Sequence, residues 1–167
     1  MDALTLIKQQ VAHARRDFQG ALADVDQGMA HWQPPGVANP IEDLVLHTVI
    51  GQDRQVSRVT GAPVLLDSWA EKLNLAADWR HTPEASRSLS TDIGVLKEYA
   101  EAVFGAVDAC LSGLSDADME KMIDGFRGPA PMANQLSSNL VTHMFEHTGE
   151  ISAIKGLQGA KGYATGG

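Results

Sequence analysis

Two histidines, His143 and His147, stand four residues apart near the C-terminal end of the sequence. An α-helix brings side chains at positions i and i+4 to the same side, close enough for two imidazoles to share one metal ion. The pair belongs to a series with the spacing of an apolar helix face, namely Leu136, Leu140, His143, His147, Ile151 and Ile154. Imidazoles on such a face need partners, because an unpaired buried polar group costs about 1–3 kcal/mol.

His47 is the best candidate for a third ligand. It follows Leu44 by three residues and precedes Gly51 by four, so it lies beside an inward-facing row of another predicted helix. Gly51 has no side chain and would leave room beside the imidazole, which favours an open site over a filled core. The other histidines fall on polar faces or in loops and are expected at the surface: His13, His31 and His81.

Three histidines with a free fourth position form a catalytic site of the zinc type. Imidazole also suits nickel, copper, iron and cobalt, so the ligands predict a divalent transition metal without identifying it. Two alternatives remain open. The triad could bind a metal only to stabilise the fold, or its cavity could hold a small ligand, without chemistry in either case. The histidines could also be core residues that hydrogen-bond to backbone or carboxylates.

Two glutamates lie close to the histidine pair: Glu146 stands between the two histidines, and Glu150 follows His147 by three residues. Glu150 lies closer to the His143 side of the predicted helix and is the better candidate to orient an imidazole or a bound water. It is also the nearest residue that could close the fourth position of a structural site. The letters from His143 to His147 match the His-x-x-Glu-His motif of inverted zincins. At about 100° per residue, however, Glu146 points to the flank of the helix, so we do not interpret the motif as a protease site.

Composition limits the possible functions. The chain has 167 residues, 44% of them hydrophobic and 20% charged, which predicts one soluble globular domain. The net charge of −8 disfavours nucleic acid and anionic membranes as partners. Cys110 is the only cysteine and falls at an apolar position, so we expect a buried side chain and neither an internal disulfide nor a cysteine-based zinc site. Residues 1–16 lack the layout of a signal peptide, and no apolar run approaches the roughly 20 residues of a membrane span, so a cytoplasmic location is expected.

Helical periodicity dominates the chain, and the predicted fold class is all-α, a four-helix bundle. The predicted helices run from Leu4 to Val25, from Ile41 to Val59, from Ile93 to Leu114, and from Pro131 to about Gly156. The second begins with Asn39, a strong N-cap residue, and Glu42 is expected to close a capping box there.

The remaining segments should contain little regular structure. Short helical pieces are expected in the long connection, around Leu66–Leu73 and Pro83–Leu89, because a connection of that length without structure would be unusual. Ser115–Glu120 resembles a short capped turn, and Met122–Phe126 is the only candidate for an extended piece. Residues 1–156 are expected to form the single domain and residues 157–167 a flexible glycine-rich tail.

Several runs together resemble one known family. They are Trp32-Gln33-Pro34-Pro35-Gly36-Val37-Ala38-Asn39-Pro40-Ile41 followed by Leu44 and His47, and His143-x-x-x-His147-Thr148-Gly149-Glu150-Ile151 followed by Gly156-Leu157-Gln158-Gly159. In order and spacing these runs resemble the DinB/YfiT-like family over most of the chain. The resemblance implies a bundle with an up-down-down-up order, often a homodimer. It also implies a divalent metal, commonly nickel or zinc, which by position would be held by His47, His143 and His147.

The same resemblance bears on activity. Characterised relatives of this kind include thiol-dependent transferases and isomerases and some hydrolases, so a small-molecule substrate and a low-molecular-weight thiol cofactor are expected. The family does not imply DNA binding, in agreement with the acidic charge. Arg54 is one possible contact for a thiol cofactor's carboxylates, and a solvated or ion-paired surface arginine is the alternative.

Overall fold

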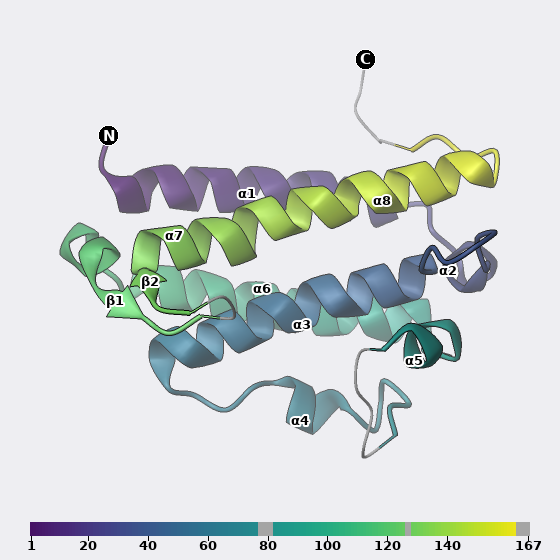
Figure 1. Cartoon of the computed structure of the whole chain (residues 1–167), viewed down its shortest axis with the longest axis horizontal. Coiled ribbons are helices and arrows are strands. Elements are labelled where there is room, and N and C mark those ends of the chain that lie inside the picture. The colour runs from purple at the N-terminus through teal and green to yellow at the C-terminus, as the bar shows by residue number, and fades with distance from the viewer. Residues whose placement is uncertain (77–81, 126–127, 163–167) are drawn as a thin grey trace.

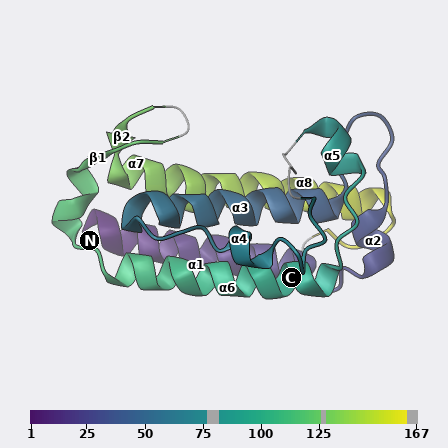
Figure 2. The ribbon, with the colours of Figure 1, turned by 90° about the horizontal axis from the view of Figure 1, so that it is seen from below.

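Four long helices form the bundle, and a computed structural model describes residues 1–76, 82–125 and 128–162 of the chain (Figure 1). The long helices are α1 (Ala3–Leu22), α3 (Ile41–Thr60), α6 (Ile93–Ser112) and a composite C-terminal helix. The composite helix consists of α7 (Met132–Leu136), a π-helical segment η2 (Ser137–Thr142) and α8 (His143–Leu157). The helices follow one another in an up-down-down-up order (Figures 1 and 2), so the predicted all-α bundle is confirmed.

Local sequence signals set most of the helix ends. Asp2 caps α1 by accepting a hydrogen bond from the backbone N–H of Thr5 at 2.7 Å. Asp92 caps α6 in the same way through the N–H of Val95 at 3.0 Å. Gly61 ends α3 in the left-handed conformation with φ of 74°, which costs glycine little because it has no Cβ.

The capping box predicted at the start of α3 is wrong. The cap position is Pro40, which has no side-chain hydrogen bond, and Glu42 is buried instead. Its Oε2 accepts a hydrogen bond from the N–H of Thr91 at 3.3 Å, and its Oε1 lies 2.6 Å from Nδ1 of His31. Burial raises the pKa of Glu42, while the neighbouring imidazole opposes that effect. The carboxylate therefore joins α3 to the segment before α6 and to the short helix α2 (Gln27–His31).

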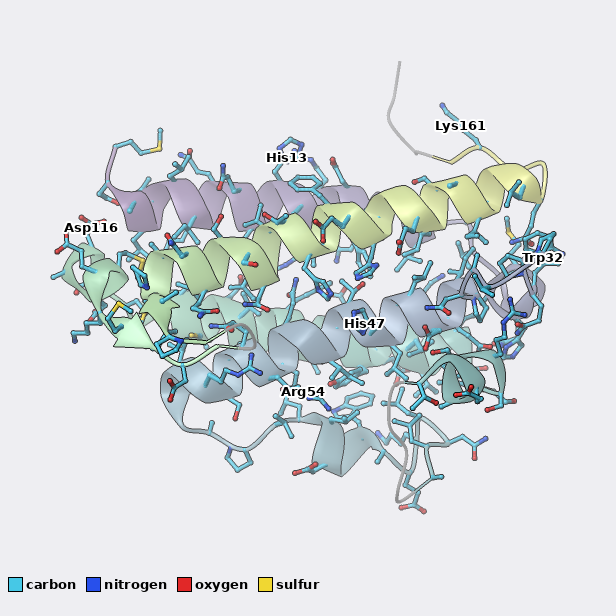
Figure 3. All side chains as sticks on the ribbon, viewed as in Figure 1. His13, Trp32, His47, Arg54, Asp116 and Lys161 are labelled. Atoms are coloured by element: carbon cyan, nitrogen blue, oxygen red, sulfur yellow. The ribbon has the colours of Figure 1, made fainter. Side chains whose placement is uncertain are left out.

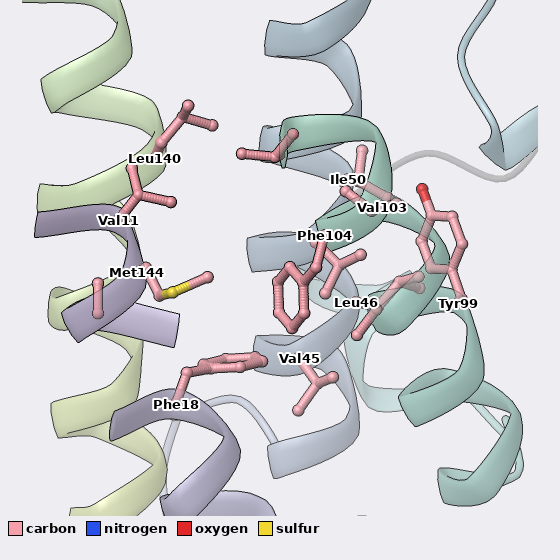
Figure 4. Packing of buried hydrophobic residues seen from close by; sticks show 14 of the residues in the cluster. Val11, Phe18, Val45, Leu46, Ile50, Tyr99, Val103, Phe104, Leu140 and Met144 are labelled. Carbon is pink, nitrogen blue, oxygen red and sulfur yellow. The ribbon is translucent and has the colours of Figure 1, made fainter. Parts of the chain in front are cut away.

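Apolar rows from all four long helices fill the interior (Figure 4). The rings of Phe18 in α1 and Phe104 in α6 meet edge to face, with their centroids 6.3 Å apart. Val45, Leu46 and Met144 are fully buried beside them. Each large apolar side chain removed from water contributes about 1.5–3 kcal/mol, so this cluster holds the helices that carry the histidines.

Short elements complete the fold. The connection after α3 runs along the face of α3 and α6 and contains α4 (Leu66–Trp69) and α5 (Pro83–Arg87), where short helical pieces were predicted (Figure 2). The 3-10 turn η1 (Asp116–Glu120) has a capping box of Ser115 and Asp118. Strand β1 (Met122–Ile123) pairs antiparallel with β2 (Ala130–Pro131) and corresponds to the first part of the predicted extended piece, whereas Phe126 lies outside the described residues.

The C-terminal end of the described chain folds back on the bundle. The side-chain amide of Gln158 donates a hydrogen bond to the carbonyl of Met29 at 3.2 Å. A Cβ placed on Gly162 would lie 2.9 Å from the carbonyl oxygen of Ser152, so this residue is in close contact with α8. None of the helices within the described ranges is both long and apolar enough to cross a membrane.

Asp53 fixes the long connection to the bundle. Its carboxylate, 2% exposed, accepts hydrogen bonds from the N–H groups of Leu65 and Leu66 at 2.9 and 2.8 Å. The buried hydroxyl of Tyr99 in α6 donates to the same carboxylate at 2.8 Å. Burial and the adjacent negative charge raise the pKa of Tyr99 well above its usual range. One carboxylate thus joins α3, α6 and the connection.

Replacing Asp53 with Ala should destabilise the protein strongly. One buried and two partly buried donors lose their acceptor, and each unpaired buried group costs about 1–3 kcal/mol, so we expect the free energy of unfolding to fall by about 3 kcal/mol. Tyr99→Phe removes a single hydrogen bond and should cost about 1 kcal/mol. Urea denaturation measures both. An Asp53→Ala loss no larger than that of Tyr99→Phe would contradict this assignment.

Candidate metal centre

The structure brings His47, His143 and His147 together. His47 lies midway along α3 (Figure 3), and the other two occupy the first turns of α8. The Nε2 atom of His143 lies 3.0 Å from Nε2 of His47 and 3.0 Å from Nε2 of His147. These ring nitrogens form a group that could hold a metal ion, with all ligand atoms within 4.8 Å of one another.

The spacing of the nitrogens fits a small divalent cation. Nitrogens at 2.0–2.1 Å from a tetrahedral ion would be about 3.3 Å apart, close to the separations in the triad. The rings are steeply inclined to one another, with interplanar angles of 65° for His47 and His143 and 88° for His143 and His147. The three rings therefore do not stack on one another, and their nitrogens lie within 4.8 Å of one another.

Glu150 orients His147. Its Oε2 lies 2.6 Å from Nδ1 of His147, so this nitrogen carries the proton and donates to the carboxylate. In the neutral form of His147 this tautomer leaves a lone pair on Nε2, the nitrogen that lies 3.0 Å from Nε2 of His143. A carboxylate on the outer nitrogen of a ligand histidine is the usual arrangement around protein metal ions. Glu150 thus makes the contact that was expected of an orienting residue.

His143, like the other two histidines, is half-buried. Burial, and secondarily the positive charge that His147 can carry, lower the pKa of His143 to about 4. It is therefore neutral at pH 7, the form that binds metal. Its Nδ1 atom is buried and has no hydrogen-bond partner among the described residues.

Hydrogen bonds between neutral imidazoles satisfy the triad only in part. A neutral imidazole has one N–H and one lone pair, and Nε2 of His147 already presents its lone pair to His143. If His143 carries its proton on Nε2, that nitrogen can donate to His147 but cannot also accept from His47. If the proton is on Nδ1, a buried donor lacks a partner and two lone pairs face each other at 3.0 Å. A cation at the centre would remove this conflict, because all three nitrogens could then present lone pairs to it.

Gly51 makes the close approach of α3 and α8 possible. A Cβ at this position would lie 3.0 Å from Cε1 and 3.2 Å from Nδ1 of His143. The room that glycine leaves, which the sequence suggested as part of an open site, is thus occupied by the His143 ring. The open space lies further along the helices.

A cavity of about 590 Å³ adjoins the triad. One wall is a row on α3 with helical spacing, and it contains His47, Gly51, Arg54 and Arg58. The facing row runs through α7, η2 and α8 and contains Asn134, Ser138, Thr142 and Glu146. The π-helical segment lies directly before His143, and such segments are frequent at functional sites.

The cavity lining differs from the sequence-based expectations at Glu146 and at Arg58. Glu146, expected on the flank of the helix, lines the cavity together with the histidines. Arg54 lines it as well, and Arg58 was missed although it continues the α3 spacing by one further turn. The 47, 51, 54, 58 pattern in the sequence was the signal that could have found it.

The other candidates that the structure describes have no part in the centre. His13 is exposed, with Nε2 at 3.4 Å from Asp17 and its ring against Phe145. Cys110 is buried, and burial raises its pKa, which disfavours the reactive thiolate. His81 lies outside the described residues.

Comparison with known proteins now defines the family. The model of the DinB superfamily matches residues 10–151. The chain belongs to the DinB superfamily. It is also similar to the crystal structure of a conserved protein from Enterococcus faecalis, with 22% identity, a TM-score of 0.80, and coverage of 94% of this chain and 97% of that chain. At this identity the likeness shows a shared fold. No curated protein matches the sequence.

Replacing Gly51 with Ala should weaken metal binding. The new methyl group would push the His143 ring off its position, and an off-rotamer side chain costs about 0.5–1.5 kcal/mol. We expect the dissociation constant of the metal to rise by up to about tenfold. Gly105→Ala in α6 is the matched control, since a Cβ there meets nothing within 4 Å. Titration of metal-free protein with zinc and a competing chelator measures both, and equal affinities in the two variants would refute the close-contact argument.

Replacing Glu150 with Gln should also weaken metal binding, because the amide no longer accepts a charge-assisted hydrogen bond from Nδ1 of His147. Loss of such an outer partner costs about 10–100-fold in metal affinity, and the exposure of Glu150 places the expected loss near tenfold. Glu98→Gln, an exposed change of the same charge on α6, controls for net charge. The same chelator competition serves as the measurement; an affinity within twofold of wild type would rule out the orienting role.

Proposed function

We propose that this DinB-superfamily protein is a metal-dependent enzyme of the hydrolase or thiol-dependent transferase type, with His47, His143 and His147 as its metal ligands. One observation carries the proposal. Three ring nitrogens converge at the wall of a cavity of about 590 Å³, a size typical of small-molecule sites. A metal held there would be in reach of a substrate.

The set of ligands supports an open centre. Structural zinc sites usually have four protein ligands, whereas catalytic sites have three and leave one position free. Within the described residues, the group that could hold a metal contains only the three histidines. Glu150, the residue that could have closed the fourth position, is engaged on the outer nitrogen of His147. This arrangement favours catalysis over a purely structural role.

The surrounding residues suggest how the chain would contribute. When bound, a divalent metal such as nickel or zinc lowers the pKa of a coordinated water or thiol and polarises a substrate oxygen. Glu146, on the same wall as the histidines, is the candidate to accept the proton released there. Glu150 holds His147 in one tautomer, and Thr142 and Ser138 offer hydroxyl groups to polar parts of a substrate.

Metal analysis of protein purified without a histidine tag tests the first part of the proposal. The wild type should contain, or take up on soaking, about one equivalent of a transition metal. His147→Ala should abolish this binding while the helical circular-dichroism spectrum persists, because apolar packing holds the bundle. His13→Ala, a change to an exposed histidine, should leave the metal content unchanged. Less than about one-tenth of an equivalent in the wild type, with none taken up, would overturn the proposal.

Catalysis needs a separate measurement on the loaded protein. A panel of small esters, amides and electrophilic acceptors of added thiols covers the two reaction types. Turnover that is lost in His147→Ala supports an enzyme. A loaded protein without turnover, whose cobalt(II) absorption spectrum also does not change with azide, would favour the non-catalytic alternative of a metal-stabilised bundle.

A further inference from the structure

Two arginines line the part of the cavity that lies away from the histidines. Arg54 and Arg58 follow His47 on α3 by seven and eleven residues, so the helical period places them on the same side of the helix. With a rise of 1.5 Å per residue, they are about 10 and 16 Å from His47 along the helix axis. The cavity thus connects the triad at one end with two guanidinium groups at the other.

Arg54 and Arg58 differ from Arg15 and Arg87 in their hydrogen bonds and ion pairs. Arg15 forms a paired contact with Asp108, its two terminal nitrogens each 2.8 Å from a carboxylate oxygen. Arg87 donates to backbone carbonyls of the loop before α3. By contrast, Arg54 and Arg58 form no hydrogen bond or ion pair with any residue that the structure describes. Their donors are therefore available to a molecule in the cavity.

The charge of the cavity differs from that of the whole protein. The chain has a net charge of −8, yet Glu146 is the only acidic residue among the described residues that line the cavity. Two arginines outweigh it, and a bound divalent metal would add further positive charge. Positive potential concentrated in a concave site attracts anions even to an acidic protein.

Apart from Glu146, the facing wall is polar and neutral. The side-chain amides of Gln135 and Asn139 are engaged, donating to the carbonyls of Gly128 and Gln135 at 3.0 and 2.8 Å. Asn134 and Ser138 also line the cavity, and their side chains form no hydrogen bond with other described residues. They offer donors and acceptors to the middle of a bound molecule without opposing its charge.

From these observations we infer that Arg54 and Arg58 form an oxyanion subsite, and that the substrate or co-substrate carries a carboxylate or phosphate at the end remote from the metal-binding group. The planar guanidinium group matches both oxyanions with paired hydrogen bonds. The inference rests on the proposed function, because the histidine triad defines the other end of the molecule. The distance along α3 implies a spacer of several bonds between the two ends.

Synthetic thiols of increasing length test the subsite. In cobalt(II)-loaded protein, the thiolate-to-cobalt absorption band reports binding of ω-mercaptoalkanoates, with ω-mercaptoalkanols as uncharged partners of equal length. Once the chain is long enough to reach the arginines, the carboxylate should bind about tenfold or more tightly than the alcohol. The Arg54→Gln/Arg58→Gln double variant should lose this advantage and still bind the alcohols normally. ω-Mercaptoalkyl phosphates show which of the two oxyanions is preferred.

A variant that removes one positive charge outside the cavity distinguishes binding by the two arginines from a general effect of the protein's net charge. Arg16→Gln removes an arginine that is exposed on α1 and does not line the cavity, so it should keep the carboxylate advantage. If the alcohols bind but carboxylates and phosphates gain nothing at any length, the subsite is refuted and the metal proposal stands. If cobalt is not taken up, the metal proposal fails, and a second measurement decides the subsite.

That second measurement uses metal-free protein. Arginine Nε–H signals in nuclear magnetic resonance spectra are followed during titration with hexanoate and with inorganic phosphate. The signals of Arg54 and Arg58 should shift and saturate with at least one of the two anions, because their free donors converge on the cavity. Shifts that stay linear and match those of Arg16 would overturn the inference without reference to any metal.

Discussion

The close approach of α3 and α8 at Gly51 is the constraint on which the site depends. Any side chain at this position would press against the His143 ring, because its Cβ would lie only 3.0 Å from Cε1 of that ring. Without that approach, Nε2 of His47 and Nε2 of His143 could not lie 3.0 Å apart, since the two residues come from helices that are distant in sequence. The positions of the three histidines thus depend on how the helices pack. The buried cluster around Phe18 and Phe104 stabilises this packing.

Helix α3 combines two roles on two faces. On one face Asp53 accepts hydrogen bonds from the connection and from Tyr99 of α6, which holds α3 in place along the bundle. On another, His47 and the arginines face the cavity. Because α3 and α6 run in the same direction, the chain must return along the bundle between them, and the buried carboxylate fixes this long connection (Figure 2). The topology therefore leaves the side of α3 that faces α8 free for the site.

The sequence predicted the helices and the three histidines because both depend on periodicity. Apolar spacing identifies the buried face of a helix, and His47, His143 and His147 lie on or beside such faces. Three features depend on tertiary contacts and were not predictable: the partner of Glu42, the ring that occupies the space at Gly51, and the position of Glu146 on the cavity wall. The helical rotation of about 100° per residue places Glu146 on the flank, outside the row of the two histidines. The cavity extends around the helix as far as this flank, so Glu146 still lines it. The π-helical segment before His143 has no local sequence signal either.

Hydrogen-bond accounting gives the strongest reason to expect a cation at the triad. Buried polar atoms in folded proteins are almost always paired, so the unpartnered Nδ1 of His143 needs an explanation. Protonation of His143 would supply one more donor, but burial lowers its pKa to about 4 and disfavours that state at neutral pH. A divalent ion requires the same neutral imidazoles that burial favours, and it accepts all three lone pairs at once. Burial of His143 thus favours the neutral imidazole, the form in which the triad could hold a metal ion.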